Sequence, residues 1–228
     1  GFNIKFKDKD GKEKNVYTTC YGPAVSRIFG SVVIIHGDDK GLRFPWAIAP
    51  RHIAIVPISL DKKIIKKAEE LKKKIGDFAD VIIDLDENKS AGEKFNHWEM
   101  KGVPVRIDLG MKELKDKKLS VFRRDINKKE LIEEKDLMKY LEKVKEESGK
   151  NLARQADGMF HGKIKNANNI KEIKKILDGG GIARCGFCSV GKEGIKCAEC
   201  IEKELAAEVR GTILDEKTDI GKCAICGE

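Results

Sequence analysis

The sequence predicts an α/β fold built on a mixed sheet, followed by a small cysteine-rich unit of α+β type. Apolar runs of strand length alternate with amphipathic runs of helical length between residues 52 and 123, the order expected of an α/β unit. Six of the seven cysteines lie within residues 185–226, in three CxxC pairs. The length of 228 residues suits two or three small domains, and we expect boundaries near residues 48 and 150.

The first part of the chain is expected to form a hairpin and one buried segment. Residues 4–20 predict two short strands around a polar turn at residues 8–11. Residues 31–35 are a continuous, mostly β-branched run, which is typical of a strand buried on both faces or of a buried helix. The turn residues 36–39 end that run.

Strand and helix signals alternate in the middle of the chain. Strands are expected at residues 52–58, 81–85, 104–109 and 119–123, and helices at residues 61–75 and 90–102. In the third strand Arg106 and Asp108 alternate with apolar residues, which predicts a half-buried strand with Arg106 free to reach out. Helical signals follow from residue 129 to 160, with an interruption at Gly149, and a short helix is expected at residues 170–177.

The charge balance favours an anionic partner. The formal net charge is +8, which favours nucleic acid through the field of the protein and the release of counterions. The same richness in Lys and Glu is also typical of a thermophile surface carrying ion-pair networks. No apolar run approaches the roughly 20 residues needed to span a bilayer, and residues 1–8 lack the apolar core of a secretory signal. We therefore expect a cytoplasmic protein with reduced thiols and no membrane partner.

The three CxxC pairs predict a zinc site. The pairs are Cys185 with Cys188, Cys197 with Cys200, and Cys223 with Cys226. Two sulfurs at this spacing can take two corners of a tetrahedral zinc ion, so two pairs complete a four-thiolate site. An all-sulfur ligand set favours structural over catalytic zinc. Two cysteines are left over, and a redox pair remains the alternative for them, although no strand–CxxC–helix context supports it.

Other catalytic motifs are absent from the sequence. It contains no GxxxxGK[ST], HExxH or GxSxG pattern, and its four histidines lack the spacing of metal ligands. The polar residues 36–39 could bind a metal, but a loop that follows a buried segment has the same composition. From patterns alone, the chain is an α/β domain joined to a zinc domain, with nucleic-acid binding favoured by its charge.

Two stretches resemble a known family. Residues 18–30, TTCYGPAVSRIFG, with HGDDKGL at residues 36–42, resemble the third signature motif of class II aminoacyl-tRNA synthetases, in its prolyl version. Residues 92–110, GEKFNHWEMKGVPVRIDLG, resemble the anticodon-binding domain of the same enzymes in their archaeal and eukaryotic-like form. That form also carries a C-terminal cysteine-rich zinc domain, so the resemblance extends over nearly the whole chain.

The resemblance implies three domains and an activity. Residues 1–48 would be the end of an antiparallel catalytic sheet, residues 49–150 the mixed-sheet anticodon-binding domain, and residues 151–228 the zinc domain. The activity implied is proline–tRNA ligation in a cytoplasmic homodimer, in which ATP, with Mg²⁺, and proline give an adenylate before transfer to tRNA. The family's first two motifs are absent from this sequence, so we expect a part of a longer enzyme that is not active alone. The alternative is a stand-alone RNA-binding module with a structural zinc site.

The resemblance also assigns site residues. Arg27 matches the arginine that contacts ATP phosphates, where a planar, permanently charged group stabilises developing charge, and Thr19 and Ser26 would line the nucleotide site. Glu99, Arg106 and Lys112 fall on positions that read anticodon bases. Carboxylates accept from the N1–H and N2–H₂ edge of guanine, and cations donate to O6 and N7. The alternative for Arg27 is a surface salt bridge, and the alternative for Glu99, Arg106 and Lys112 is that they are ordinary exposed charges.

The resemblance further selects a zinc ligand set. The family pattern matches Cys185, Cys200, Cys223 and Cys226 best, and the longer gap between the first two leaves Cys188 and Cys197 as alternates.

Overall fold

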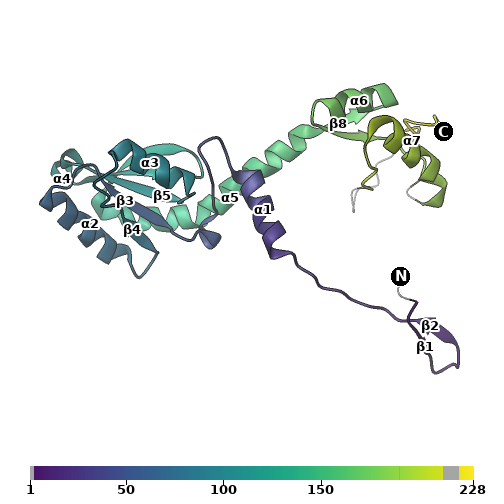
Figure 1. The fold of residues 1–228 in the computed structure, drawn as a ribbon, viewed down its shortest axis with the longest axis horizontal. Coiled ribbons are helices and arrows are strands. Elements are labelled where there is room, and N and C mark those ends of the chain that lie inside the picture. The colour runs from purple at the N-terminus through teal and green to yellow at the C-terminus, as the bar shows by residue number, and fades with distance from the viewer. Residues whose placement is uncertain (1–2, 190, 213–220) are drawn as a thin grey trace.

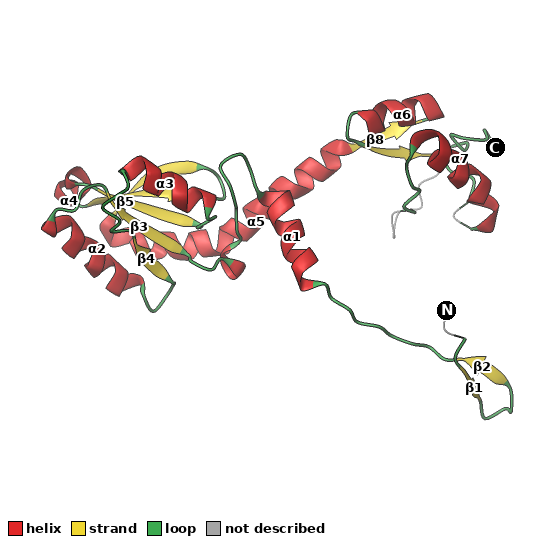
Figure 2. Cartoon of the chain, in the orientation of Figure 1, coloured by secondary structure: helices red, strands yellow, loops and turns green. Residues whose placement is uncertain are grey.

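A computed structural model describes residues 3–189, 191–212 and 221–228. Figure 1 shows a sheet domain at one end, joined by the long helix α5 to a smaller unit at the other end, with a hairpin standing away from both. Figure 2 shows the same parts by secondary structure. Within the described ranges, no helix combines the length and apolar character needed to cross a bilayer.

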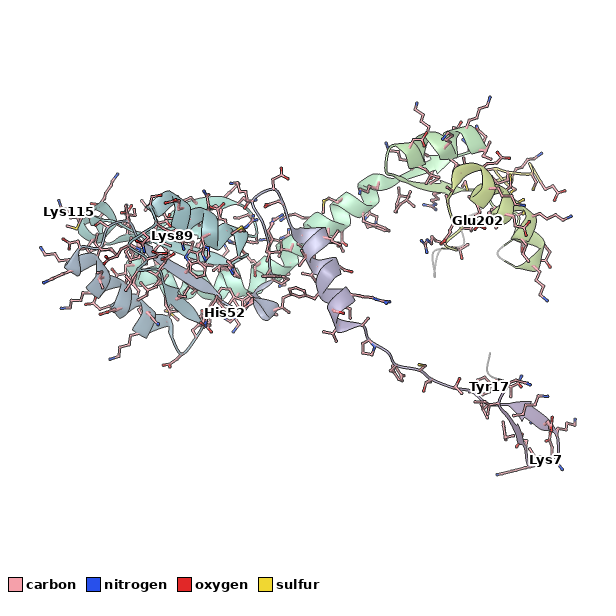
Figure 3. All side chains as sticks on the ribbon, viewed as in Figure 1. Lys7, Tyr17, His52, Lys89, Lys115 and Glu202 are labelled. Atoms are coloured by element: carbon pink, nitrogen blue, oxygen red, sulfur yellow. The ribbon has the colours of Figure 1, made fainter. Side chains whose placement is uncertain are left out.

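The N-terminal hairpin is confirmed. Strands β1 (Lys5–Lys7) and β2 (Glu13–Asn15) pair antiparallel. An extended segment follows, and Tyr17 within it, labelled in Figure 3, is fully exposed. Helix α1 (Val25–His36) comes next.

The apolar run at residues 31–35 forms part of helix α1, so the helix alternative holds. The expected burial is wrong, because no residue of α1 is buried and Ile34 is 82% exposed. Four apolar residues in a row indicate neither a strand nor a helix by periodicity alone, and they do not reveal whether a partner surface is present.

A mixed sheet forms the centre of the larger domain, as predicted, and it has five strands where four were expected. Its strands are β3 (Ile53–Pro57), β4 (Val81–Ile83), β5 (Val105–Leu109), β6 (Lys118–Arg123) and β7 (Lys128–Glu133). Their spatial order is β4-β3-β5-β6-β7, with β3 parallel to β4 and β5, and the last two strands antiparallel. The expected helix from residue 129 is wrong at its start, because residues up to 133 pair with β6 instead.

Helices cover both faces of the sheet. Helices α2 (Lys62–Ile75) and α5 (Leu137–Lys163) pack on the face that carries Ile53, Ile55 and Ile107, forming the main hydrophobic core. Helix α3 (Ala91–Met100) contacts the opposite face. Asp61 accepts a hydrogen bond from the Lys63 backbone at the start of α2, and Ser90 with Glu93 forms a capping box at the start of α3.

Because both faces are covered, strand β5 is buried along its whole length. The expected half-buried strand is therefore wrong, and Arg106 and Asp108 are only 5% and 0% exposed. A central strand with helices on both sides offers no accessible face. This burial decides how the charged residues of β5 can act.

The smaller unit follows helix α5. Gly149 does not interrupt α5, which continues from Leu137 to Lys163. Strands β8 (Ile164–Ala167) and β9 (Ile182–Cys185) pair in parallel, connected by α6 (Ile170–Asp178), which confirms the short helix predicted there. The remaining elements are η1 (Trp46–Ile48), α4 (Met111–Asp116), η2 (Glu134–Asp136), η3 (Lys192–Gly194) and α7 (Ile195–Leu205).

Candidate nucleic-acid interface and metal centre

A buried ionic network lies between helix α3 and strand β5. Arg106 donates from Nη1 to Oε1 of Glu99 at 2.7 Å and from Nε to Oδ1 of Asp108 at 2.8 Å. Nζ of Lys129 lies 2.9 Å from the other oxygen of Asp108, an ionic contact outside hydrogen-bonding geometry. The guanidinium is thus held by two carboxylates, which a buried charge requires.

Aromatic rings enclose the Arg106 guanidinium. Its central carbon lies 4.1 Å from the ring centre of Phe95 and 4.7 Å from that of Phe122. Phe122 is the partner of Arg106 on strand β6, and the small residue Ala54 is its partner on β3. Cation–π contacts of this kind strengthen when they are desolvated, so the arginine is fixed in position as well as neutralised.

Two further contacts fix helix α3 to the sheet. Trp98 donates from its indole nitrogen to Oδ2 of Asp84 at 2.8 Å, and the ammonium of Lys94 donates to the Asp84 carbonyl at 3.3 Å. Lys94 is only 3% exposed. These contacts hold the helix that carries Glu99 in one orientation.

The structure brings two of the three expected anticodon residues together. The expectation that Arg106 is free to reach out is wrong, because its side chain is 7% exposed and bound to Glu99. Glu99 is itself 12% exposed at the side chain. Lys112 is exposed in α4, beyond the carboxyl end of β5, and Figure 3 labels Lys115 of the same helix at the outer end of the domain. Glu99 and Arg106 therefore form one rigid pair, with Lys112 on a separate element.

An ion pair that the sequence did not predict connects the loop after α1 to this site. Arg124 is 1% exposed and donates to both carboxylate oxygens of Asp38, at 2.6 and 2.7 Å. It also donates to the backbone carbonyl of Glu99 at 3.2 Å. The Arg124 guanidinium holds the pKa of the Asp38 carboxyl far below its usual range, with help from Asn127. Asp38 thus binds an arginine, which favours the interpretation of residues 36–39 as a polar loop over their interpretation as a metal site.

The same loop approaches the end of helix α3 very closely. Gly41 has a φ of +125°, and a Cβ there would lie 2.4 Å from the Cα of Met100. The backbone nitrogen of Leu42 donates to the Met100 carbonyl at 3.1 Å. Gly102, with a φ of +72°, leaves space for Leu42 in the same way. The two glycines let the backbones touch, so the loop and the end of α3 act as one body.

Replacing Asp38 with asparagine should destabilise the protein by about 3 kcal/mol near neutral pH, because Arg124 is left buried without its counter-charge. The folded pKa of Asp38 is depressed, so its contribution is present above pH about 4 and is lost as the pH falls through the depressed pKa. Urea unfolding followed by circular dichroism should show this difference shrinking in acid. An equal difference at pH 7 and pH 3 would contradict the assignment.

The residues expected at a nucleotide site lie at the N-terminal end. Thr19 is in the extended segment before α1, and Ser26 and Arg27 are in the first turn of that helix. All three are exposed. Their nucleotide contacts stay a prediction.

A cysteine cluster forms in the smaller unit. The sulfur atoms of Cys188, Cys197, Cys223 and Cys226 all lie within 4.8 Å of one another. Sγ of Cys197 is 3.5 Å from that of Cys188 and 3.9 Å from that of Cys223. Tetrahedral zinc with bonds of about 2.3 Å would place its sulfurs about 3.8 Å apart, so the cluster fits this metal.

The four clustered cysteines are not the ligand set expected from the resemblance. Cys185 ends strand β9 and packs against the small core of Ala167 and Ile173. Cys200 lies in α7, with its sulfur 3.4 Å from Oε1 of Glu204. The alternates Cys188 and Cys197 belong to the cluster in place of Cys185 and Cys200.

The electrostatics of the cluster suit a cation. Burial opposes ionisation of the Cys223 thiol, but backbone hydrogen bonds from Cys226 and Ile225 outweigh it and lower its pKa to about 6. The hydrogen bond with Cys188, followed by burial, raises the pKa of Cys197 to about 12. One thiolate is therefore favoured without a metal, whereas a full set of four needs the charge of a bound cation.

A model of a known protein family matches the sheet domain. Residues 52–144 match the family model described as "Anticodon binding domain". This segment contains α3, β5 and the Glu99–Arg106 pair.

The similarity to known proteins extends beyond residues 52–144. The chain is 38% identical to a proline–tRNA ligase of Thermofilum pendens and 35% identical to one of Methanobrevibacter smithii, over 99% and 100% of its length. A crystal structure of prolyl-tRNA synthetase from Cryptosporidium parvum, complexed with L-proline and AMP, matches all of the chain with a TM-score of 0.78 at 28% identity. The chain spans about half the length of these relatives. The resemblance inferred from residues 18–42 and 92–110, and the mixed α/β fold class, are confirmed.

Proposed function

We propose that the chain is the tRNA-binding part of a proline–tRNA ligase. The observation that carries the proposal is the rigid Glu99–Arg106 pair inside an anticodon-binding domain. The relatives named proline–tRNA ligase align with the whole chain, which supports proline as the amino acid. The whole enzyme would use ATP, Mg²⁺ and proline to make an adenylate and would charge tRNA as a cytoplasmic homodimer.

The chemistry of the pair suits guanine, which proline anticodons contain. Oε1 of Glu99 is bound to Arg106, and Oε2 remains to accept from the N1–H and N2–H₂ edge of a base. Arg106 holds Glu99 in one orientation and does not itself reach out, because it is buried. Lys112, exposed on α4, would donate to a second base or to a phosphate. The fixed acceptor Glu99 would give specificity for the base, and the exposed donor Lys112 would add affinity.

The three proposed domains have separate roles. Residues 1–48 would belong to the catalytic domain, with Arg27 binding ATP phosphates beside Thr19 and Ser26. Residues 49–150 would read the anticodon, and residues 151–228 would bind structural zinc through Cys188, Cys197, Cys223 and Cys226. Helix α5 crosses residue 150 without a break and would couple the last two domains.

The test of this proposal is anticodon-dependent binding. The purified chain should bind a proline tRNA transcript at least ten times more tightly than the same transcript with its anticodon guanines replaced by adenines, since a well-formed base contact is worth about 1–3 kcal/mol. Filter binding at one fixed salt concentration measures both affinities. Equal affinities would reject anticodon reading and would favour the alternative of a general RNA-binding module.

A further inference from the structure

The loop of residues 38–42 lies beside Glu99 although it comes from outside the matched domain, residues 52–144. The Asp38–Arg124 ion pair and the close approach of Gly41 to Met100 fix its position. Lys40 lies in the middle of this loop. Its ammonium is 3.8 Å from Oε2 of Glu99, and its side chain is 60% exposed.

The backbone of Lys40 is held by the same carboxylate that binds Arg124. Its backbone nitrogen donates to Oδ1 of Asp38 at 2.9 Å. Asp38 and Gly41 also exchange two backbone hydrogen bonds, at 2.9 and 3.1 Å, which close the turn around Lys40. The turn is therefore rigid, whereas the exposed lysine side chain at its tip can move.

The two cations that face Glu99 differ in accessibility. Arg106 binds Oε1 and is only 7% exposed, so it cannot leave the carboxylate to meet a ligand. Lys40 faces Oε2, the oxygen that remains for a base, across a distance longer than a hydrogen bond. A base that donates to Oε2 takes the place of Lys40 there, and the ammonium then lies next to the bound nucleotide. Its three N–H donors can turn to a phosphate or to a base acceptor.

We propose that Lys40 is a further RNA-binding residue of the anticodon site, contacting the nucleotide bound at Glu99, and that Asp38 and Arg124 are its positioning residues. The inference rests on the proposed function, because it needs RNA bound at Glu99. It assigns part of the anticodon site to the segment that follows α1. Reading the anticodon then depends on a loop shared with the N-terminal part of the chain.

The experiment compares Lys40→Gln with Lys40→Arg and with a matched control, Lys143→Gln. Lys143 is 65% exposed and also lies 3.8 Å from a glutamate, but on α5. Fluorescence anisotropy measures the affinity of the whole chain for a proline anticodon stem–loop at several salt concentrations. Lys40→Gln should weaken binding about fourfold near physiological salt and reduce the slope of log K against log salt by about 0.7, one phosphate contact. Lys40→Arg and Lys143→Gln should keep the wild-type slope.

Two results would overturn the inference, and they can be told apart. If Lys40→Gln behaves as Lys143→Gln while Glu99→Gln still loses its preference for guanine, Lys40 has no role and the proposed function stands. If Glu99→Gln also keeps wild-type preference, the proposed function itself fails. Lys40 is exposed, so its variants should fold, and circular dichroism checks this.

Discussion

Replacing Cys223 with serine should remove the metal from the C-terminal unit and unfold the packing of helix α7 around the cluster. The core of this unit is small: one cluster has Ala167, Ile173 and Ala224 as its buried residues, and Ile201 of α7 is buried as well. Such a core contributes little, so metal binding, worth about 10–16 kcal/mol in zinc-finger peptides, would supply most of the folding free energy. Zinc content per chain, measured by mass spectrometry after chelator dialysis, should fall from about one to near zero, and α7 should become sensitive to protease.

Serine variants of the other cysteines test whether zinc loss is specific to the four clustered cysteines. Cys188→Ser and Cys197→Ser should lose zinc as Cys223→Ser does, because their sulfurs belong to the cluster. Cys185→Ser and Cys200→Ser should keep about one zinc, since these residues lie outside it. Zinc loss in the last two variants, with zinc retained in the first two, would restore the ligand set implied by the family pattern.

Replacing Glu99 with glutamine should abolish most of the preference for anticodon guanines while the fold is retained. Glutamine keeps the shape and can still accept from Arg106, which also retains Asp108 as a counter-charge. It presents an amide where guanine needs an acceptor for two donors. We expect the discrimination between guanine and adenine transcripts to fall tenfold to a hundredfold, about 1–3 kcal/mol.

The control for Glu99→Gln is the same change at Glu69. Glu69 is an exposed glutamate of helix α2, which packs on the other face of the sheet. Glu69→Gln should therefore leave both affinity and discrimination at the wild-type level. A Glu99→Gln protein with normal melting behaviour and undiminished guanine preference would mean that another residue reads the base.

Local patterns predicted the parts of the fold that depend on neighbours in sequence. Alternating apolar strands and amphipathic helices predicted the mixed sheet, and Asp61 and Ser90 begin the helices expected after them. The pattern could not show that β5 is covered on both faces. Polar residues at alternate positions usually face water, but here Arg106 and Asp108 neutralise one another beneath α3. Strand β7 was missed because residues 129–133 merge with the helical signal of α5.

Contacts between distant residues could not be predicted from spacing. Arg124 and Asp38 are 86 positions apart, and no local pattern marks Arg124 as the partner of the loop. The cysteines show the same limit. Spacing predicted a group of four cysteines and the structure gathers four, but which four of the six come together depends on contacts between segments that are distant in the sequence.

The central claim is that Glu99 accepts a hydrogen bond from an anticodon guanine, and a double-mutant cycle tests it most directly. Wild type and Glu99→Gln are each measured against stem–loops that carry guanine or adenine at one anticodon position at a time. Direct contact predicts a coupling free energy of at least about 1 kcal/mol at one position, so that adenine costs the wild type tenfold but the variant little. Additive effects at every anticodon position, with no coupling, would contradict the claim.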